Sequence, residues 1–430
     1  MRPGHGHGEG RDDAEQHERA GDVAADDAQA GDRGLGRPGG HGGQHRARRP
    51  DTLAIMQVSR PAVSWDQALA RRVERHFTPR DTPAAAAHAI SGAQAQIPSA
   101  GEHSLALRVV GGTRTGVQDA LWNERSVVRT HGPRGTVHLL PAADLPLWTG
   151  ALSALPSTSP MPDGVRLTPE QTEAVVAAIG AALDGNDLTL DELHEQVVAT
   201  AGPWAGDLVM PAFQTMWPRW RQALGTAARR GVLCFGPNRG RAVTYAHPHT
   251  TPLPGPEALR DLVFRYLWSY GPGTARTFAQ WLGAPPAWSA ELFAGLPLVE
   301  VDFEGAPAWV APGDDTFAAE PPSGVRLLPY FDAYGIGAMP RTRVFPGAMA
   351  QRALANGQAG NFPVVLVDGV VAGVWHQKRG GRRIAVTVEF GADPDARVRA
   401  ALDREVERLG VILEGVPALT LGPVAVGPHA

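Results

Sequence analysis

The sequence contains very little cysteine and lysine, and each scarcity excludes a class of chemistry. Cys234 is the one cysteine among 430 residues, which excludes an intrachain disulfide and argues against a cysteine-based zinc site. Lys378 is the one lysine, so a reaction that needs a lysine Schiff base has a single candidate. The chain also lacks a run of about 18 apolar residues and a secretory leader. We therefore expect a cytoplasmic protein without a membrane span.

Apolar periodicity is missing from the first part of the chain. Residues 1–55 are rich in Gly, His, Asp and Arg, and they bury too little apolar surface to offset the entropy cost of ordering. We expect a disordered tail. Met56 stands just before the first patterned segment, so translation that starts at this methionine is an alternative to a tail.

The rest of the chain repeats one order of elements three times: amphipathic helices, then two strand-like runs. Ser64 and Thr168 are placed to cap the first helices of two of these units, and Gly271-Pro272-Gly273 separates two helices of the third. Helices followed by a two-stranded ribbon are typical of winged-helix domains. The pattern predicts an α+β fold with winged helices over residues 60–145, 165–248 and 255–312, followed by a β-rich region over residues 325–425.

Two further expectations concern one connector and one helix. The proline-rich stretch over residues 141–163 predicts a connector between the first two units. The segment that carries Trp217, Trp220 and Leu224 predicts a helix that ends at Arg229-Arg230-Gly231, before the second pair of strands.

Positive charge is concentrated in one part of a chain whose net charge is -4. Residues 341–383 contain seven Lys and Arg residues against one acid, Asp368, which is 7 − 1 = +6. Part of this charge lies in a predicted turn between two strands, and a basic β-turn beside three winged helices favours nucleic-acid binding. The candidate DNA-binding residues are Arg134, His138, Arg341, Arg343, Lys378, Arg379, Arg382 and Arg383.

Gln94 and Gln96 form the motif around which we interpret the chain. A helical run from Pro83 to Ile90 leads to Gly92, which allows a tight turn. If residues 94–96 are extended, both amides lie on one face and Ala95 on the other. Each amide offers one acceptor and two donors, so the pair can hold a water molecule or a base edge. The alternative is that both are solvated loop amides.

Three segments resemble the winged-helix DNA glycosylases of the AlkZ and YcaQ kind. They are Gly92–Pro98, Val128–Pro141 and Leu327–Tyr334. The resemblance covers roughly residues 60–420 and implies tandem winged helices with a C-terminal β region. In this family a Gln-x-Gln or Gln-x-Asp pair is catalytic, and Gln94 and Gln96 match its Gln-x-Gln form. The resemblance also implies a substrate, double-stranded DNA with alkylated or crosslinked purines.

Paired amides suit the chemistry that the resemblance implies. A purine alkylated at N7 is cationic and a good leaving group, so the enzyme has to position water and stabilise an oxocarbenium-like sugar. We expect a monofunctional hydrolase that needs no cofactor or metal and acts as a monomer. Asp332 is a candidate for stabilising the cation or polarising the water, with a structural aspartate as the alternative. His138 is expected to brace the β-ribbon or to touch a phosphate.

Two other functions stay open at this point. A DNA-binding regulator without catalysis would have the same helices and the same basic turn. The family usually has an acidic residue where this chain has Ala333, and this departure leaves a catalytically silent relative as a further reading.

Overall fold

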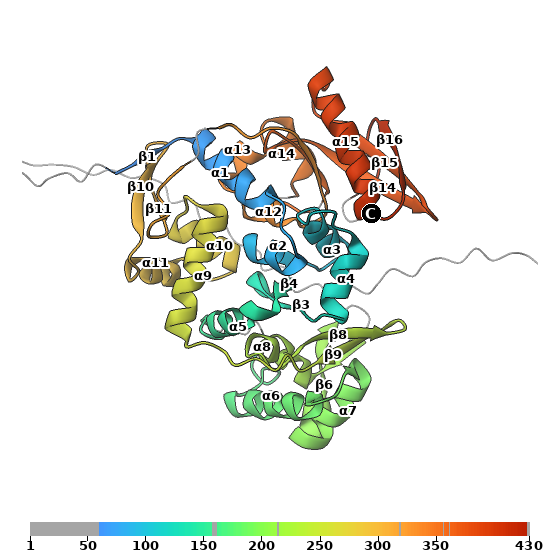
Figure 1. Ribbon diagram of the computed structural model, residues 1–430. Coiled ribbons are helices and arrows are strands. Elements are labelled where there is room, and N and C mark those ends of the chain that lie inside the picture. The colour runs from blue at the N-terminus through green and yellow to red at the C-terminus, as the bar shows by residue number, and fades with distance from the viewer. Residues whose placement is uncertain are drawn as a thin grey trace, which may run out of the picture. The chain divides into compact units, whose positions relative to one another are not determined.

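Helices and small sheets alternate along the chain in the computed structural model, which gives a mixed α+β architecture (Figure 1). The structure describes residues 60–156, 161–212, 215–317, 320–355, 357–360 and 362–427. The predicted tail over residues 1–55 lies outside this range. From Pro61 onward the described chain forms one unit. None of its helices is long and apolar enough to span a membrane.

The first set of helices leads into a three-stranded sheet. Ser64 and Gln67 form the predicted cap of α1, and Thr82 caps α2 with Pro83 in its first turn. The sheet has the order β2-β4-β3 and is antiparallel. The elements are α1 (Trp65–Phe77), α2 (Pro83–Ala89), β2 (Ala93–Gln94), α3 (Pro98–Ala106), α4 (Arg114–Trp122), β3 (Val127–His131) and β4 (Val137–Pro141).

The second set follows the same plan. Capping boxes built on Thr168 and Thr189 open its first two helices, and its sheet has the order β5-β9-β8. A two-stranded sheet of β6 (Leu208–Ala212) and β7 (Thr215–Pro218) is inserted before the last helix. The other elements are α6 (Pro169–Leu183), β5 (Leu188–Thr189), α7 (Leu190–Ala201), α8 (Leu224–Arg229), β8 (Cys234–Arg239) and β9 (Ala242–Ala246).

The third set closes its sheet with a strand from the start of the folded chain. β1 (Ala62–Val63) pairs in parallel with β10, so the sheet order is β1-β10-β11. The remaining elements are α9 (Gly255–Tyr270), α10 (Ala275–Leu282), α11 (Pro286–Ala294), β10 (Val299–Phe303) and β11 (Ala306–Val310).

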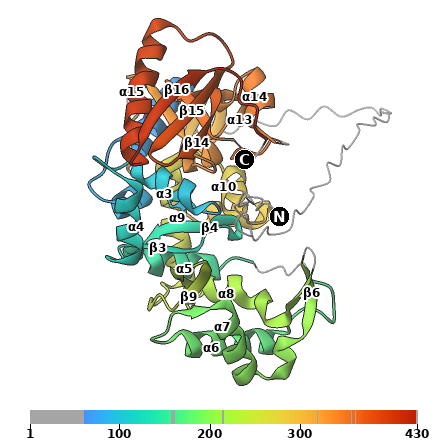
Figure 2. The same ribbon diagram turned by 90° about the vertical axis from the view of Figure 1, so that its right-hand side faces the viewer.

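A five-stranded sheet dominates the C-terminal region, with the order β12-β13-β14-β15-β16 (Figure 2). The strands are β12 (Val325–Leu328), β13 (Val364–Val367), β14 (Val370–Gly380), β15 (Arg383–Phe390) and β16 (Val416–Leu421), and α15 (Ala396–Ile412) packs against the sheet. Three short helices lie between β12 and β13: α12 (Ala333–Gly337), α13 (Arg341–Val344) and α14 (Ala348–Ala353). The predicted β-rich character is therefore correct, but these short helices were not predicted.

One predicted connection is wrong, and one predicted helix is correct only in its last part. The expected connector over residues 141–163 contains the buried helix α5 (Leu145–Ser153), because Pro146 is compatible with a first helical turn and Trp148 packs in an apolar cluster with α9. The expected helix with Trp217, Trp220 and Leu224 is present only in its last part, as α8 (Leu224–Arg229), whereas Trp217 lies in β7 and Trp220 in a 3₁₀ turn over Arg219–Ala223. Pro218 explains this, because a proline disfavours the helical conformation of the residue before it.

The hydrophobic cores do not follow the predicted domain boundaries. One core combines side chains from residues 65–139 with side chains from residues 325–426, so the first unit and the C-terminal sheet are packed as one body. A second core joins α5 to α9, α10 and α11, and a third belongs to the second unit, with Val137 of β4 packed against it. The region that carries Gln94 is thus supported from several distant parts of the chain.

Candidate active site

Two consecutive residues with positive φ turn the chain from α2 into β2. Ser91 has φ +56° and Gly92 has φ +90°. A Cβ atom at Gly92 would lie 2.6 Å from Leu140 Cδ2, so glycine is needed for both its backbone freedom and its small size. The turn aims the following residues along the edge of the sheet.

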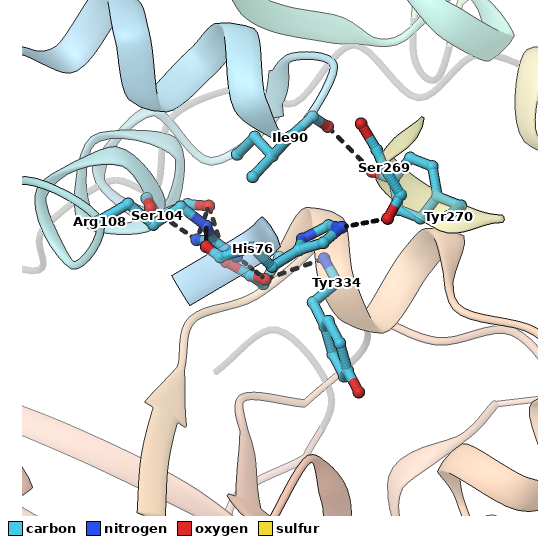
Figure 3. A network of polar contacts seen from close by, with 8 residues as sticks. His76, Ile90, Ser104, Arg108, Ser269, Tyr270 and Tyr334 are labelled. Atoms are coloured by element: carbon cyan, nitrogen blue, oxygen red, sulfur yellow. Dashed lines mark hydrogen bonds and ion pairs between the residues drawn. The ribbon is translucent and has the colours of Figure 1, made fainter. Parts of the chain in front are cut away.

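Helix α9 holds this turn in place with polar contacts (Figure 3). The Tyr270 hydroxyl donates to the Ile90 carbonyl at 3.0 Å, and the Ser269 hydroxyl donates to the Ala89 carbonyl at 3.2 Å. The hydroxyls of Ser91 and Ser269 lie 2.9 Å apart. All of these groups are buried, and a buried hydrogen bond that is lost leaves an unsatisfied group, so the turn is tightly specified.

The predicted geometry of the two glutamines is confirmed. Gln94 pairs with His138 of β4, and the Ala95 amide donates to the Val137 carbonyl at 2.7 Å, so the backbone is extended. Ala95 is fully buried on the opposite face. Gln94 Nε2 donates to Gln96 Oε1 at 2.6 Å. Gln94 is 6% exposed and Gln96 is half-buried, so these amides are not the solvated loop amides of the alternative interpretation.

Arg134 completes this group, which we call the amide cluster (Gln94, Gln96 and Arg134). Its Nη2 donates to Gln94 Oε1 at 2.8 Å, and its Nη1 donates to the Trp281 carbonyl at 2.5 Å. Burial lowers the pKa of Arg134 to about 10, which still leaves it charged at neutral pH. Arg134 was predicted to contact DNA, and the structure places it on the catalytic candidates.

His138 is a buried neutral base beside the cluster. Its Nδ1 lies 2.9 Å from the Thr136 carbonyl, which can only accept, so Nδ1 carries the proton. Burial lowers the pKa of His138 to about 3, and the charge of Arg134 contributes. A Cβ atom at Gly132 would lie 2.7 Å from this ring. The close packing supports the expectation that His138 braces the ribbon.

Asp332 lies in a buried network of hydrogen bonds, which we call the Asp332 network (Asp332, Arg108, Ser104 and His76). Each carboxylate oxygen accepts two hydrogen bonds: Oδ1 from Arg108 Nη2 and the Tyr334 amide, and Oδ2 from Arg108 Nη1 and the Ser104 hydroxyl, at 2.7–3.0 Å. Burial by itself would raise the pKa of Asp332, but Arg108 and these hydrogen bonds lower it. The residue is 3% exposed.

The Asp332 network also connects to the turn before Gln94 (Figure 3). Arg108 Nε donates to the His76 carbonyl at 2.9 Å, and His76 Nε2 lies 3.1 Å from the Ser269 carbonyl. Because Ser269 also contacts Ser91, one chain of polar contacts runs from Asp332 to the turn. This geometry fits the structural interpretation of Asp332, while a catalytic role stays an untested prediction.

The two arginines predicted near residue 340 differ from each other. Arg341 donates to the carbonyls of Gly335 and Ile336, and burial together with the charge of Arg134 lowers its pKa to about 10. It therefore lies within electrostatic reach of the amide cluster. Arg343 is exposed and contacts Glu304 Oε2 at 2.8 Å.

The β14–β15 hairpin carries the other four predicted cations, and all four are exposed. Arg379 donates to the Leu413 carbonyl at 2.6 Å and so caps the end of α15. Lys378, Arg382 and Arg383 have no ion pair or side-chain hydrogen bond within the described residues. These three side chains are available to a ligand.

Several groups that contact the amide cluster, the turn before it or Asp332 were not predicted. They are Trp281, Ser269, Tyr270, Arg108 and Ser104. Trp281 contributes a backbone carbonyl, which leaves no mark in a sequence. The other four groups contact partners that are at least 178 residues away along the sequence. A single sequence carries no local signal for such contacts.

Comparisons with known proteins decide the family. A family model described as DNA glycosylase AlkZ-like matches residues 87–411. The chain belongs to the AlkZ-like DNA glycosylases. It is 33% identical over 340 residues to an interstrand DNA cross-link repair glycosylase from Streptomyces sahachiroi, an alignment that covers 73% of this chain and 88% of the relative.

A solved structure supports the same assignment. The fold is similar to that of Streptomyces sahachiroi DNA glycosylase AlkZ with a TM-score of 0.68 and 27% identity, covering 84% of this chain and all of that one. The resemblance seen in the sequence is therefore confirmed. As an AlkZ-like glycosylase, the protein acts on DNA, and the regulator without catalysis is disfavoured.

Proposed function

We propose that this glycosylase hydrolyses the N-glycosidic bond of N7-alkylated purines in DNA and unhooks interstrand crosslinks formed at such purines. The observation that carries the proposal is the amide cluster, two glutamine side chains joined to each other and fixed by an arginine at the edge of a sheet. The function of the 33% identical relative, interstrand cross-link repair, supports the crosslink as substrate.

The reaction needs little acid–base catalysis. The C1′–N9 bond breaks and its electron pair leaves with the base, which neutralises the positive charge of the alkylated purine. Water adds to C1′ and loses a proton to solvent, which leaves an abasic sugar in an intact strand. Amides are poor bases, but their oxygens can orient a water molecule, and positioning of this kind contributes several kcal/mol.

The free lone pairs of the cluster fit this role. A carbonyl oxygen has two lone pairs, and in Gln94 and Gln96 one of them is used within the cluster. The second lone pair of each oxygen is left for a hydrogen of the water. Because Gln96 is half-buried and Gln94 almost fully buried, we propose that the water lies on the Gln96 side.

DNA binding is proposed to rest on three winged helices and the hairpin cations. Each of the three helix sets ends in a small antiparallel ribbon, as winged helices do. Lys378, Arg382 and Arg383 are exposed at the tip of the hairpin formed by two long strands, where they can reach phosphates. We expect Arg343 and Arg379 to contribute less to DNA binding, because each side chain already contacts another part of the protein.

Release of 7-methylguanine from a methylated duplex, and separation of an N7-crosslinked duplex, test the function. We expect both activities with an intact abasic strand as product, since a lyase step would need a lysine at the amide cluster and Lys378 is on the hairpin. Tight binding to one undamaged sequence with no base release would instead favour the regulator, and binding to damaged DNA with no release would favour the silent relative.

A further inference from the structure

Arg134 can form a hydrogen bond only with an acceptor atom, because a guanidinium group donates hydrogen bonds and accepts none. The atom of Gln94 that faces Arg134 Nη2 must therefore be Oε1, which places Nε2 of Gln94 against Gln96 Oε1. An amide side chain without such a neighbour can rotate by 180° and exchange its oxygen and nitrogen. The contact with Arg134 thus selects one of two directions for the whole pair.

The backbone at Arg134 is unusual for an arginine. Arg134 has φ +59° and Gly135 has φ +69°, in a turn closed by the Thr136 amide and the Pro133 carbonyl at 3.3 Å. Two successive residues with positive φ favour Asn-Gly or Asp-Gly, whose first residue tolerates the left-handed region. Arginine at the first position costs free energy, and strained residues cluster at functional sites.

Helix α10 binds the second guanidinium nitrogen of Arg134. Arg134 Nη1 donates to the carbonyl of Trp281 in the last turn of α10, where carbonyl groups lack partners within the helix. Gly283 ends that helix with φ +79°, and a Cβ atom there would lie 2.9 Å from Arg134 Cα. No ion pair with a carboxylate holds Arg134 among the described residues. The cation is thus fixed by two neutral oxygens.

We propose that Arg134 is a positioning residue, which fixes the direction of the Gln94–Gln96 pair so that both carbonyl oxygens keep one lone pair for water. The inference rests on the proposed function and adds a residue to it. Arg134 acts through Gln94 and need not touch the DNA. The alternative, a direct contact between Arg134 and a phosphate, predicts a different set of measurements.

Single-turnover base release at saturating protein separates these two roles. We expect Arg134→Gly to lower the rate about 10- to 100-fold with less than a threefold change in DNA affinity, as for the loss of a positioning contact. Glycine suits the positive φ, so relief of backbone strain should offset part of the cost of the two lost hydrogen bonds, and the variant should stay folded at the assay temperature. Added guanidinium should restore part of the rate. Arg260→Ala, which removes an exposed arginine bonded to Asp261, is the matched control.

A double-variant cycle completes the test. If Arg134 acts through Gln94, then Arg134→Gly added to Gln94→Ala causes no further loss of rate. Multiplicative losses, or a loss confined to DNA affinity, overturn the inference and leave the proposed function intact. A Gln94→Ala variant with full activity would overturn the proposed function, and this inference with it.

Discussion

The amide cluster and the Asp332 network are both buried polar groups built around an arginine, but they differ in how completely they are satisfied. In the Asp332 network each carboxylate oxygen accepts two hydrogen bonds and the charges of Asp332 and Arg108 are paired. In the amide cluster each carbonyl oxygen accepts one hydrogen bond, and Arg134 has no carboxylate partner among the described residues.

This difference suggests a structural role for the Asp332 network and a ligand-binding role for the amide cluster. A fully satisfied network stabilises a single arrangement, and the Asp332 network joins α1, α3 and α9 beneath the turn at Ser91. A group that keeps free lone pairs and a strained backbone has unused capacity for a ligand. The network therefore supports the turn that leads to Gln94, and the cluster is the site that we propose.

The largest expected effect distinguishes the two glutamines within the cluster. Gln94→Glu keeps the acceptor for Arg134 but loses the donor to Gln96, so either two oxygens face each other or the Gln96 amide rotates and turns its oxygen away. We expect about a 100-fold loss of single-turnover base release, similar to the loss of one catalytic hydrogen-bond donor. Gln96→Glu retains the acceptor for Gln94 and should lose clearly less. Equal losses in both variants would contradict the direction assigned to the pair.

The second expected effect is on folding. Asp332→Asn removes the charge that compensates Arg108, and an unpaired buried charge costs about 3–5 kcal/mol. Chemical denaturation should show this decrease in the free energy of unfolding, whereas the rate of base release per folded molecule should change little. A variant that folds normally but releases no base would move Asp332 into the catalytic machinery.

The hairpin should produce a smaller effect on affinity alone. Replacing Lys378, Arg382 and Arg383 with Ala should weaken DNA binding and reduce the slope of log K against log salt by about 0.9 for each lost phosphate contact. Measurement of affinity at several salt concentrations checks this. Arg230→Ala, at an exposed pair with Glu173, is a suitable control. An unchanged slope would place the DNA-binding surface elsewhere.

The pH dependence of the two groups should differ as well. Amides do not titrate, and the pKa values of His138, about 3, and of Arg134, about 10, lie outside the working range. The rate of base release should therefore be flat from about pH 5 to pH 9, whereas a carboxylate or histidine base would give a sloping profile.

Stability should depend on pH where the rate does not. The pKa of Asp332 is below its ordinary value of 3.8, so its contribution is present above about pH 4 and is lost as the pH falls through the folded-state pKa. His76 and His103 are buried with pKa values lowered to about 3 from 6.5. The unfolded chain binds these protons first, so stability should also fall between about pH 6.5 and pH 3. Asp332→Asn should remove only the lower part of this dependence.

Local signals predicted much of the fold. The capping residues Ser64 and Thr168 begin helices where expected, because a cap depends on neighbours a few residues away. Helix α5 was missed because its prolines suggested a connector, while the packing of Trp148 against α9 that stabilises it is a long-range contact. The shared core of the first and last regions was missed for the same reason.

The candidate site was predicted in its centre and missed at its edges. In an extended strand successive side chains point to opposite faces, so the order Gln94, Ala95, Gln96 places both glutamines on the same face. Arg134 was named for its charge, but its contact with Gln94 depends on a turn with positive φ and on a carbonyl of α10, and neither is visible in the sequence.

The measurement that tests the central claim most directly is single-turnover release of 7-methylguanine by the Gln94→Ala/Gln96→Ala double variant, at saturating protein and with melting temperature monitored. We expect the rate to fall at least 100-fold while the protein stays folded and still binds DNA. Release at the unchanged rate from the folded double variant would contradict the claim that the paired amides direct water to the sugar.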